Sequence, residues 1–271
     1  MTRRPVRTLA LVLASPLALL GFHPGVAQAS TPTCFGKAAT MVVTASSPLV
    51  VYGHASADVI LIKAVGHVIH AGGGNDLVCG SAGHDYIDGG AGADKIAGLG
   101  GDNTIVGGDG NDVLTGGHGN DTLSGGAGNG VEYGGAGNDT MYGGAGADTM
   151  SGGDGADVEY GGLGDDQIIG GAGNDTENGG ADADRVEGGT GEDSLAGGSG
   201  NDTLSGGDGN DHLRGDAGDV TLDGGAGVDV DNGGDGSDTF QVGSSDTVED
   251  PTADDTEPTS TDDDPSVPST T

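Results

Sequence analysis

Residues 116–124 read Gly-Gly-His-Gly-Asn-Asp-Thr-Leu-Ser, and residues 197–205 return the same order as Gly-Gly-Ser-Gly-Asn-Asp-Thr-Leu-Ser. Their common form is Gly-Gly-x-Gly-x-Asp-x-apolar-x. It recurs every nine residues from Ala71 to Gln241, nineteen times, without one insertion or deletion. A fixed short period predicts a solenoid, because each repeat then forms one unit that stacks on its neighbours. We number the positions 1 to 9 and count the repeats from Ala71.

Each repeat combines a turn with a short strand. Glycines at positions 1, 2 and 4 allow left-handed backbone conformations and leave no side chain between adjacent turns. Positions 7 to 9 are expected to form the strand, with the apolar side chain at position 8 facing inward. One inward residue in nine gives a thin core, which cannot by itself offset the entropy lost on ordering so much glycine. Bound metal is the expected source of the missing stabilisation.

The pattern resembles the hemolysin-type calcium-binding repeat (RTX) family. The resemblance is strong over 71–241, and two degenerate repeats precede it at Gly53–Leu61 and Ile62–His70. It implies an all-β fold, a right-handed parallel β-roll in which two nonapeptides form one coil. It also implies multiple calcium ions, each bound between the turns of repeats n and n+2. The alternative is a disordered glycine-rich segment, but such a segment would not keep Asp and an aliphatic residue in register.

Carried over by position, the motif predicts that the calcium ligands are the Asp residues at position 6. These are Asp76, Asp85, Asp94, Asp112, Asp121, Asp139, Asp148, Asp157, Asp166, Asp175, Asp184, Asp193, Asp202, Asp211, Asp229 and Asp238. Three repeats have Asn103, Gly130 or Val220 there instead. The longest uninterrupted row therefore belongs to the even repeats, from Asp121 to Asp229, where we expect the best-occupied sites.

Four repeats place an acid at the inward position 8: Glu132, Glu159, Glu177 and Asp231. Glu159 and Glu177 belong to repeats n and n+2, so their strands should be neighbours about 4.8 Å apart. Two inward carboxylates at that spacing are costly unless protonated or paired. Two hypotheses follow: the middle of the roll opens first when calcium falls, or the side chains escape to solvent through a looser coil.

The first 29 residues have the pattern of a signal peptide. A basic start with Arg3, Arg4 and Arg7 precedes an apolar stretch from Leu9 to Leu20 and the cleavage motif Ala27-Gln28-Ala29. The competing interpretation is an uncleaved anchor, but the apolar stretch is short for a membrane span. We expect a secreted, extracellular protein with no membrane span after cleavage, where sites with a Kd of about 10⁻⁴–10⁻³ M would be suited to the ambient calcium.

Cleavage would leave all 43 acidic residues and five of the eight basic ones, a net charge of about −38. Such a charge excludes nucleic acid as a partner and should expand the calcium-free chain by self-repulsion. Residues 242–271 form an acidic tail rich in Pro, Thr and Ser, which we expect to be disordered.

Two cysteines remain in the mature chain, Cys34 and Cys79. A disulfide is the default in an oxidising compartment, with two free thiols as the alternative. The bond would hold residues 30–52 as a cap over the first coils of a roll that spans residues 53–241. Solenoids need such caps because an open end exposes core and strand edges.

No catalytic motif is present: the sequence has no His-Glu-x-x-His, Gly-x-Ser-x-Gly or Gly-x-x-x-x-Gly-Lys pattern. We therefore expect a calcium-dependent structural or interaction module and not an enzyme. One alternative is an adhesin or a saccharide-recognition module that uses a face of the roll. A weaker one is a non-catalytic relative of a secreted hydrolase or toxin. Ice binding through position 3 is disfavoured, since that position is mostly Ala or Asp, with Thr only at Thr190. The biological partner, protein or saccharide, is not specified by the sequence.

Overall fold

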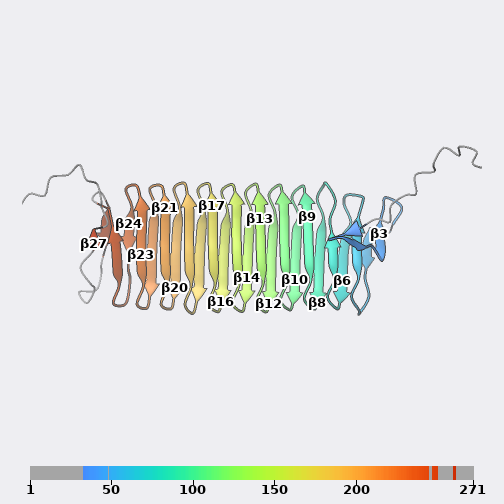
Figure 1. The fold of residues 1–271 in the computed structure, drawn as a ribbon, viewed down its shortest axis with the longest axis horizontal. Helices are drawn as coiled ribbons and strands as arrows, with labels where there is room; N and C mark the ends of the chain where they lie inside the picture. The colour runs from blue at the N-terminus through green and yellow to red at the C-terminus, as the bar shows by residue number, and fades with distance from the viewer. Residues whose placement is uncertain (1–32, 48, 244–245, 250–258, 261–271) are drawn as a thin grey trace, which may run out of the picture. The chain divides into compact units, whose positions relative to one another are not determined.

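The computed structural model describes residues 33–47, 49–243, 246–249 and 259–260. The predicted signal peptide lies outside them, as does most of the predicted tail. The described residues form an all-β parallel roll of two facing sheets, with turns along both edges (Figure 1). None of them belongs to a helix, so no described helix is long and apolar enough to cross a membrane.

Even-numbered strands form one sheet and odd-numbered strands the other, because each nonapeptide contributes one strand and successive strands alternate between sheets. Sheet I contains β4 (Val50–Tyr52), β6 (Val68–Gly73), β8 (Tyr86–Ala91), β10 (Thr104–Asp109), β12 (Thr122–Ala127), β14 (Thr140–Ala145), β16 (Val158–Leu163), β18 (Thr176–Ala181), β20 (Ser194–Ser199), β22 (His212–Ala217), β24 (Val230–Asn232) and β26 (Thr247–Glu249). Sheet II contains β3 (Met41–Val43), β5 (Val59–Ile62), β7 (Leu77–Cys79), β9 (Lys95–Gly100), β11 (Val113–His118), β13 (Val131–Ala136), β15 (Thr149–Asp154), β17 (Gln167–Ala172), β19 (Arg185–Thr190), β21 (Thr203–Asp208), β23 (Thr221–Ala226), β25 (Thr239–Val242) and β27 (Thr259–Ser260).

The strands pair in parallel with a register of two repeats, so equal positions face each other. In sheet I, Ile105 pairs with Leu123, and Leu123 with Met141. These position-8 side chains are fully buried and belong to the one hydrophobic cluster found between the sheets. The predicted inward position is therefore confirmed, and the core is a single layer of side chains contributed alternately by the two sheets.

The turns depend on left-handed backbone at positions 2 and 4. Gly117 and Gly119 have φ of 116° and 121°, and a Cβ on Gly119 would lie 2.6 Å from the carbonyl of Gly101 in the turn two repeats earlier. Three non-glycine residues keep a positive φ in equivalent places: Leu99 (78°), Asp182 (80°) and Asp216 (71°). Asp tolerates this region better than Leu does, so Leu99 carries the larger local strain.

Both ends of the roll extend beyond the predicted limits of 53–241. Strands β3 and β4 lie in the segment expected to be only a cap, yet they pair in parallel with β5 and β6 and form a first coil. At the other end, β26 pairs with β24 and β27 with β25. Strand pairing requires alternating side chains and free backbone groups rather than the glycine motif, so coils can form where the motif is absent.

Before the first coil, β1 (Thr33–Cys34) and β2 (Lys37–Ala38) form a short antiparallel hairpin. The predicted disulfide is present: Cys34 is bonded to Cys79, with the two Cα atoms 5.6 Å apart. Strand β1 packs on β5 and β7, and Cys34 is buried. The bond therefore joins the hairpin to the outer side of the third strand of sheet II.

Candidate metal centre

The position-6 acids form two rows along opposite edges of the roll. Turns of odd repeats lead from sheet I to sheet II, and turns of even repeats lead back, so the two sets of turns lie on different edges (Figure 1). The odd row runs from Asp76 to Asp238 and the even row from Asp85 to Asp229. All sixteen predicted ligands are buried, although the turns around them are exposed.

One carboxylate oxygen of each acid is used by the backbone. Asp157 Oδ1 accepts a hydrogen bond from the Asp139 amide at 2.7 Å, and the Asp157 amide donates to Asp175 Oδ1 at 2.8 Å. The same bond recurs along both rows, with the donor 18 residues before the acceptor. Along most of each row, this ladder fixes the orientation of the carboxylates and joins a turn to the turn two repeats away.

The second carboxylate oxygen is buried and makes no hydrogen bond. This applies to Oδ1 of Asp85 and to Oδ2 of Asp76, Asp94, Asp112, Asp121, Asp139, Asp148, Asp157, Asp166, Asp175, Asp184, Asp193, Asp202, Asp211 and Asp229. Asp238 occupies the equivalent place, with Oδ1 accepting from the Val220 amide at 2.9 Å. A buried carboxylate oxygen without a hydrogen-bond partner is costly, so a row of such oxygens fits the binding of cations.

Backbone carbonyl oxygens lie beside these unbonded atoms. A Cβ built on Gly143, at position 1, would stand 2.6 Å from Asp148 Oδ2 and 2.7 Å from the carbonyl oxygen of Gly161. Glycine at this position therefore leaves a space bordered by one carboxylate and one carbonyl oxygen. Calcium prefers such hard oxygen ligands from both sources, so the residues present fit this ion.

Side chains alone do not form the sites. Within the described ranges, no three His, Cys, Asp or Glu side chains converge on a common point. A calcium ion here would take carboxylate oxygens from successive acids of one row and complete its shell with turn carbonyls. That arrangement differs from a cage built of side chains, and it makes occupancy dependent on the stacking of the turns.

Burial raises the pKa of these acids. It raises the pKa of Asp139 to about 7, against the opposing hydrogen bond from the Asp121 amide and with support from the charges of Asp157 and Asp121. The pKa of Asp184 is likewise raised by burial to about 7. Without a cation the rows therefore favour protonation, and a bound cation would have to displace those protons.

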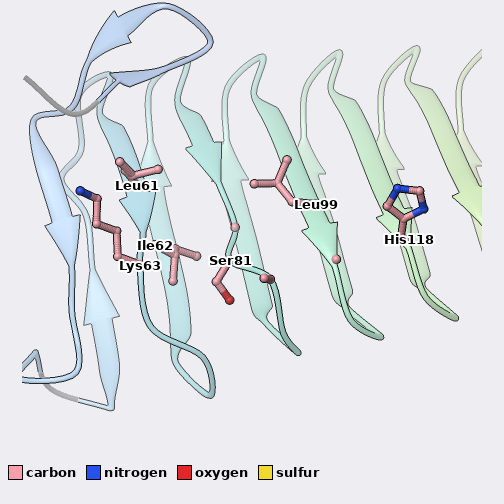
Figure 2. Close-up of a pocket in the computed structure, with 9 residues that line it drawn as sticks. Leu61, Ile62, Lys63, Ser81, Leu99 and His118 are labelled. Atoms are coloured by element: carbon pink, nitrogen blue, oxygen red, sulfur yellow. The ribbon is translucent and has the colours of Figure 1, made fainter. Parts of the chain in front are cut away.

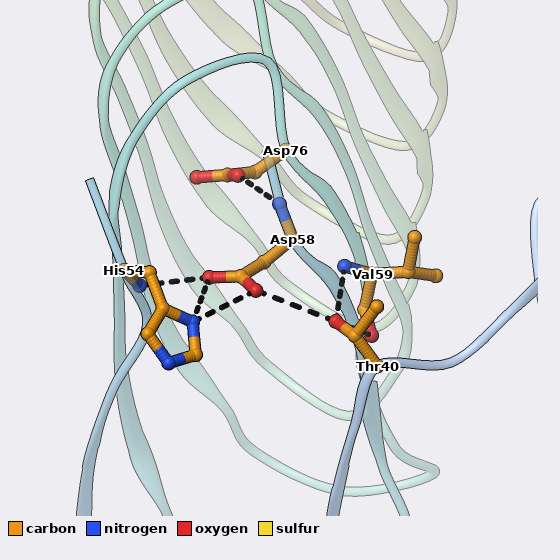
Figure 3. Close-up of polar contacts among 5 residues, drawn as sticks. All are labelled: Thr40, His54, Asp58, Val59 and Asp76. Atoms are coloured by element: carbon orange, nitrogen blue, oxygen red, sulfur yellow. Dashed lines mark hydrogen bonds and ion pairs between the residues drawn. The ribbon is translucent and has the colours of Figure 1, made fainter. Parts of the chain in front are cut away.

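At the N-terminal end of the odd row, side chains and backbone of the protein bind the carboxylate. Asp58 lies in the degenerate repeat Gly53–Leu61, 18 residues before Asp76. Its Oδ2 accepts a hydrogen bond from the His54 amide at 2.7 Å and lies 3.0 Å from His54 Nδ1 (Figure 3). Thr40 Oγ1 donates to Asp58 Oδ1 at 3.4 Å. Burial raises the pKa of Asp58, but the His54 hydrogen bonds outweigh it and the pKa is lowered. Protein groups thus satisfy both oxygens here, and the row needs no cation at this end.

The position-8 acids stay inside. Glu132, Glu159, Glu177 and Asp231 are at most 1% exposed, so the hypothesis that they escape to solvent is wrong. Burial is the main cause that raises their pKa, to about 8, 9, 10 and 7 respectively. The carboxyl groups of Glu132, Glu159 and Glu177 are therefore mainly protonated in the metal-free roll at neutral pH, and that of Asp231 is partly protonated.

Two further polar features were not predicted. Asn or Asp at position 5 forms an exposed ladder in the opposite direction, as where Asn120 Oδ1 accepts from the Asn138 amide at 2.9 Å. Beyond the last repeat, Asp246 Oδ1 accepts from the Asp229 amide at 3.2 Å and so continues the even row. The recurrence of Asn at position 5 was a usable sequence signal. Asp246 follows Asp229 by 17 residues, not by a multiple of nine, so the repeat pattern did not indicate that it continues the row.

A surface pocket lies near the N-terminal coils, beside the turn whose Ser81 amide donates to Asp85 Oδ2. Leu61, Ile62, Leu99 and the Lys63 and His118 side chains border it, and none of its lining residues is acidic (Figure 2). It offers no oxygen cluster for a divalent cation and does not belong to the candidate metal sites.

Comparison with known proteins agrees with the repeat pattern. The family model described as the RTX calcium-binding nonapeptide repeat matches residues 68–96, 97–132, 133–159, 160–177, 178–213 and 205–240. No curated protein matches the sequence. Among solved structures, the fold is similar to the crystal structure of a hyperactive, Ca²⁺-dependent, β-helical antifreeze protein from an Antarctic bacterium. The TM-score is 0.50 and the identity 18%, over 76% of this chain and 83% of that chain. At that identity the likeness shows a shared fold.

Proposed function

Because this chain belongs to the RTX calcium-binding nonapeptide repeat family, we propose that it is an extracellular calcium-binding module whose roll is completed by the ions it binds. The ligands are the sixteen position-6 acids, each acting together with turn carbonyls. The module acts as a structural or interaction element and not as an enzyme.

The observation that carries this proposal is the row of buried carboxylate oxygens without hydrogen-bond partners. Fifteen such atoms recur at one position of the repeat. Most of them lie beside a position-1 glycine that leaves room for an ion, as Asp148 Oδ2 lies beside Gly143 and the carbonyl oxygen of Gly161. A protein that folded without cations would gain stability from replacing these acids by apolar or hydrogen-bonded residues.

Calcium binding and folding should be one event. The chain has a net charge of −35, and both rows concentrate negative charge inside the roll. In the absence of cations this charge and the thin core oppose the compact state. The disulfide is consistent with an oxidising, extracellular setting, where calcium is abundant enough for sites of modest affinity.

Equilibrium dialysis with radioactive calcium tests the proposal directly. We expect several ions per chain, a Kd on the order of 10⁻⁴–10⁻³ M, and little competition from magnesium, which demands a tighter octahedral shell. Binding of less than one ion per chain at millimolar calcium, or equal competition by magnesium, would overturn it.

A second candidate function is recognition of a saccharide on the outer face of sheet I. Tyr142 and Tyr160 lie on adjacent strands β14 and β16, with ring centroids 5.3 Å apart and planes 8° from parallel. Both rings are more than 40% exposed, and aromatic faces of this kind bind sugar rings and other flat ligands. Binding to a glycan array that is lost in Y142A/Y160A, with calcium binding retained, supports this candidate, and no binding by the parent chain rejects it.

A further inference from the structure

One repeat departs from the motif twice. Residues 125–133 have Gly130 at position 6, where the preceding and following repeats of the odd row have Asp112 and Asp148. The same repeat has Glu132 at position 8, although its register partners Leu114 and Met150 are apolar. An acid is thus missing from the turn and present two residues later on the strand.

The Glu132 carboxylate is fully enclosed and unpaired. Its side chain is 0% exposed, and neither Oε1 nor Oε2 has a hydrogen-bond partner. An inward side chain of this kind would ordinarily be expected to pack its carboxyl against Leu114 and Met150 in the core. The surroundings of Oε1 show a different placement.

In the flanking repeats of the odd row, the unbonded Asp oxygen lies beside the position-1 glycine. A Cβ on Gly107 would meet Asp112 Oδ2, and a Cβ on Gly143 would meet Asp148 Oδ2. In the repeat between them, a Cβ on Gly125 would meet Glu132 Oε1, together with the carbonyl oxygen of Gly143 at 2.6 Å. Glu132 Oε1 therefore occupies the place that Oδ2 of the aspartate occupies elsewhere.

Glu132 also fills the space that an aspartate at position 6 would need. A Cβ built on Gly130 would overlap Glu132 Oε1 and stand 3.3 Å from Asp148 Oδ1. The Gly130 amide still donates to Asp148 Oδ1 at 2.6 Å, so the link from this turn to the next turn of the odd row is kept. Gly130 and Glu132 are complementary: the missing side chain makes room for the longer one, which approaches from the strand.

We propose that Glu132 is the calcium ligand of the repeat that lacks Asp at position 6, so that the odd row is continuous from Asp76 to Asp202. The inference rests on the proposed function, since it assumes that the rows bind calcium. It also changes the expectation from the sequence, in which the even row from Asp121 to Asp229 was the longest.

Val220 provides the internal contrast. It replaces the acid in the repeat 215–223, where position 8 is Leu222. A Cβ on Gly215 would stand 3.1 Å from Val220 Cγ2, with no carboxylate among its nearest atoms. This repeat is a true gap in the odd row, whereas the repeat with Glu132 is not.

Calcium stoichiometry of the full chain, measured by equilibrium dialysis, tests the proposal with three variants. E132L removes the carboxylate and restores an apolar core position. G130D/E132L restores the common motif, with Asp in the turn and Leu on the strand. M150L, on the adjacent strand β15, is the matched control for a change in core packing.

We expect E132L to bind about one ion fewer per chain than the parent, and G130D/E132L and M150L to bind the parental number. A terbium titration, read by luminescence, should show the same order. If Glu132 is only a protonated core residue, E132L binds the parental number and melts at a higher temperature with or without calcium, which overturns the inference. A loss in E132L that G130D/E132L does not reverse overturns it as well, because the loss then reflects packing.

This experiment distinguishes failure of the proposed function from failure of the role assigned to Glu132. If the parent chain binds no calcium, the proposed function is wrong, whatever the variants show. A parent chain that binds calcium, with E132L unchanged, removes only the role of Glu132. If E132L does not fold, E132Q keeps the shape of the side chain without its charge, and the same loss of about one ion is expected; a parental ion number in E132Q contradicts the inference.

Discussion

Glu159 and Glu177 lie opposite each other in register on the adjacent strands β16 and β18, both fully buried between the sheets. None of their carboxyl oxygens has a hydrogen-bond partner. Burial, together with the charges of Asp157 and Asp175, raises the pKa of Glu159 to about 9. Burial and the charge of Glu159 raise the pKa of Glu177 to about 10. The middle of sheet I therefore holds two neutral, unsatisfied acids where its neighbours hold Met141 and Leu195.

Replacing Glu159 should stabilise the roll. E159L removes an unsatisfied buried polar group and adds apolar packing against Met141, so we expect a gain of about 1–3 kcal/mol in the free energy of unfolding. Urea denaturation in excess calcium measures it. L213A, on strand β22 of the same sheet, is the control and should cost about 2–5 kcal/mol. A loss of stability in E159L would mean that the carboxyl has a partner in the folded chain.

The same pair should make the middle of the roll the first part to open when calcium is withdrawn. Hydrogen exchange resolved by segment, at calcium concentrations just below saturation, should show the fastest exchange among the interior strands in β16 and β18. Local opening of this kind starts where buried contacts are weakest. Uniform protection from Gly107 to Gly215 would contradict the expectation.

Removing one charge from a row should weaken calcium binding without disturbing the fold. D157N retains an oxygen for the hydrogen bond from the Asp139 amide but loses the negative charge at the unbonded position. Even outer-shell partners change metal affinity by about 10–100-fold, so loss of a ligand charge should cost at least about tenfold at that site. Isothermal titration calorimetry measures the change. The control D154N removes an exposed charge at position 3 that acts on Asp157 only through space, so it should change the affinity much less than D157N does. Equal effects of the two variants would indicate only a general charge effect.

The raised pKa values of the aspartates predict that low pH stabilises the metal-free roll. Burial raises the pKa of Asp139 and Asp184 to about 7 and that of Asp166 and Asp211 to about 6, from an ordinary value of 3.8. The folded chain then holds protons that the unfolded chain releases. The stabilisation that these protons give the metal-free roll is complete when the pH is below the ordinary pKa of 3.8. It is lost as the pH rises through about 6 to 7. Calcium binding needs the ionised form and should strengthen over the same range.

Thermal melts of calcium-depleted protein between pH 4 and 8, followed by circular dichroism, measure this dependence. The melting temperature should fall as the pH rises without calcium and should not fall in millimolar calcium. A metal-free roll that becomes more stable toward neutral pH would show that these carboxylates already have partners in the folded chain.

The disulfide should stabilise the N-terminal coils. It closes a separation of 45 residues and ties the β1–β2 hairpin to β7. The chain-entropy relation gives about 4 kcal/mol for a loop of this size. C34S/C79S should therefore lower the urea midpoint in saturating calcium, and a reducing agent should do the same to the parent chain but not to the variant. An unchanged midpoint would mean that the first coils unfold separately from the rest.

Much of this structure could be predicted because the period fixes it. The nine-residue spacing places Leu114 and Leu123 inside, and the pairing of repeats n and n+2 that the RTX resemblance implies predicts the two sheets and the two rows of acids. The register of Glu159 with Glu177 follows from the same count. The coil formed by β3 and β4 could not be predicted this way, since its pairing depends on backbone groups and not on the glycine motif. The role of Glu132 was hidden because its position in the repeat assigns it to the core, while its length lets the carboxylate reach the turn.

Circular dichroism of the calcium-depleted chain at neutral pH, titrated with calcium and then with chelator, shows whether calcium is required for the roll to fold. We expect a reversible transition from disordered chain to β-structure that millimolar calcium produces and equimolar magnesium does not. A β signal that persists unchanged in chelator at neutral pH would contradict it, because the roll would then stand without the ions assigned to its two rows of aspartates.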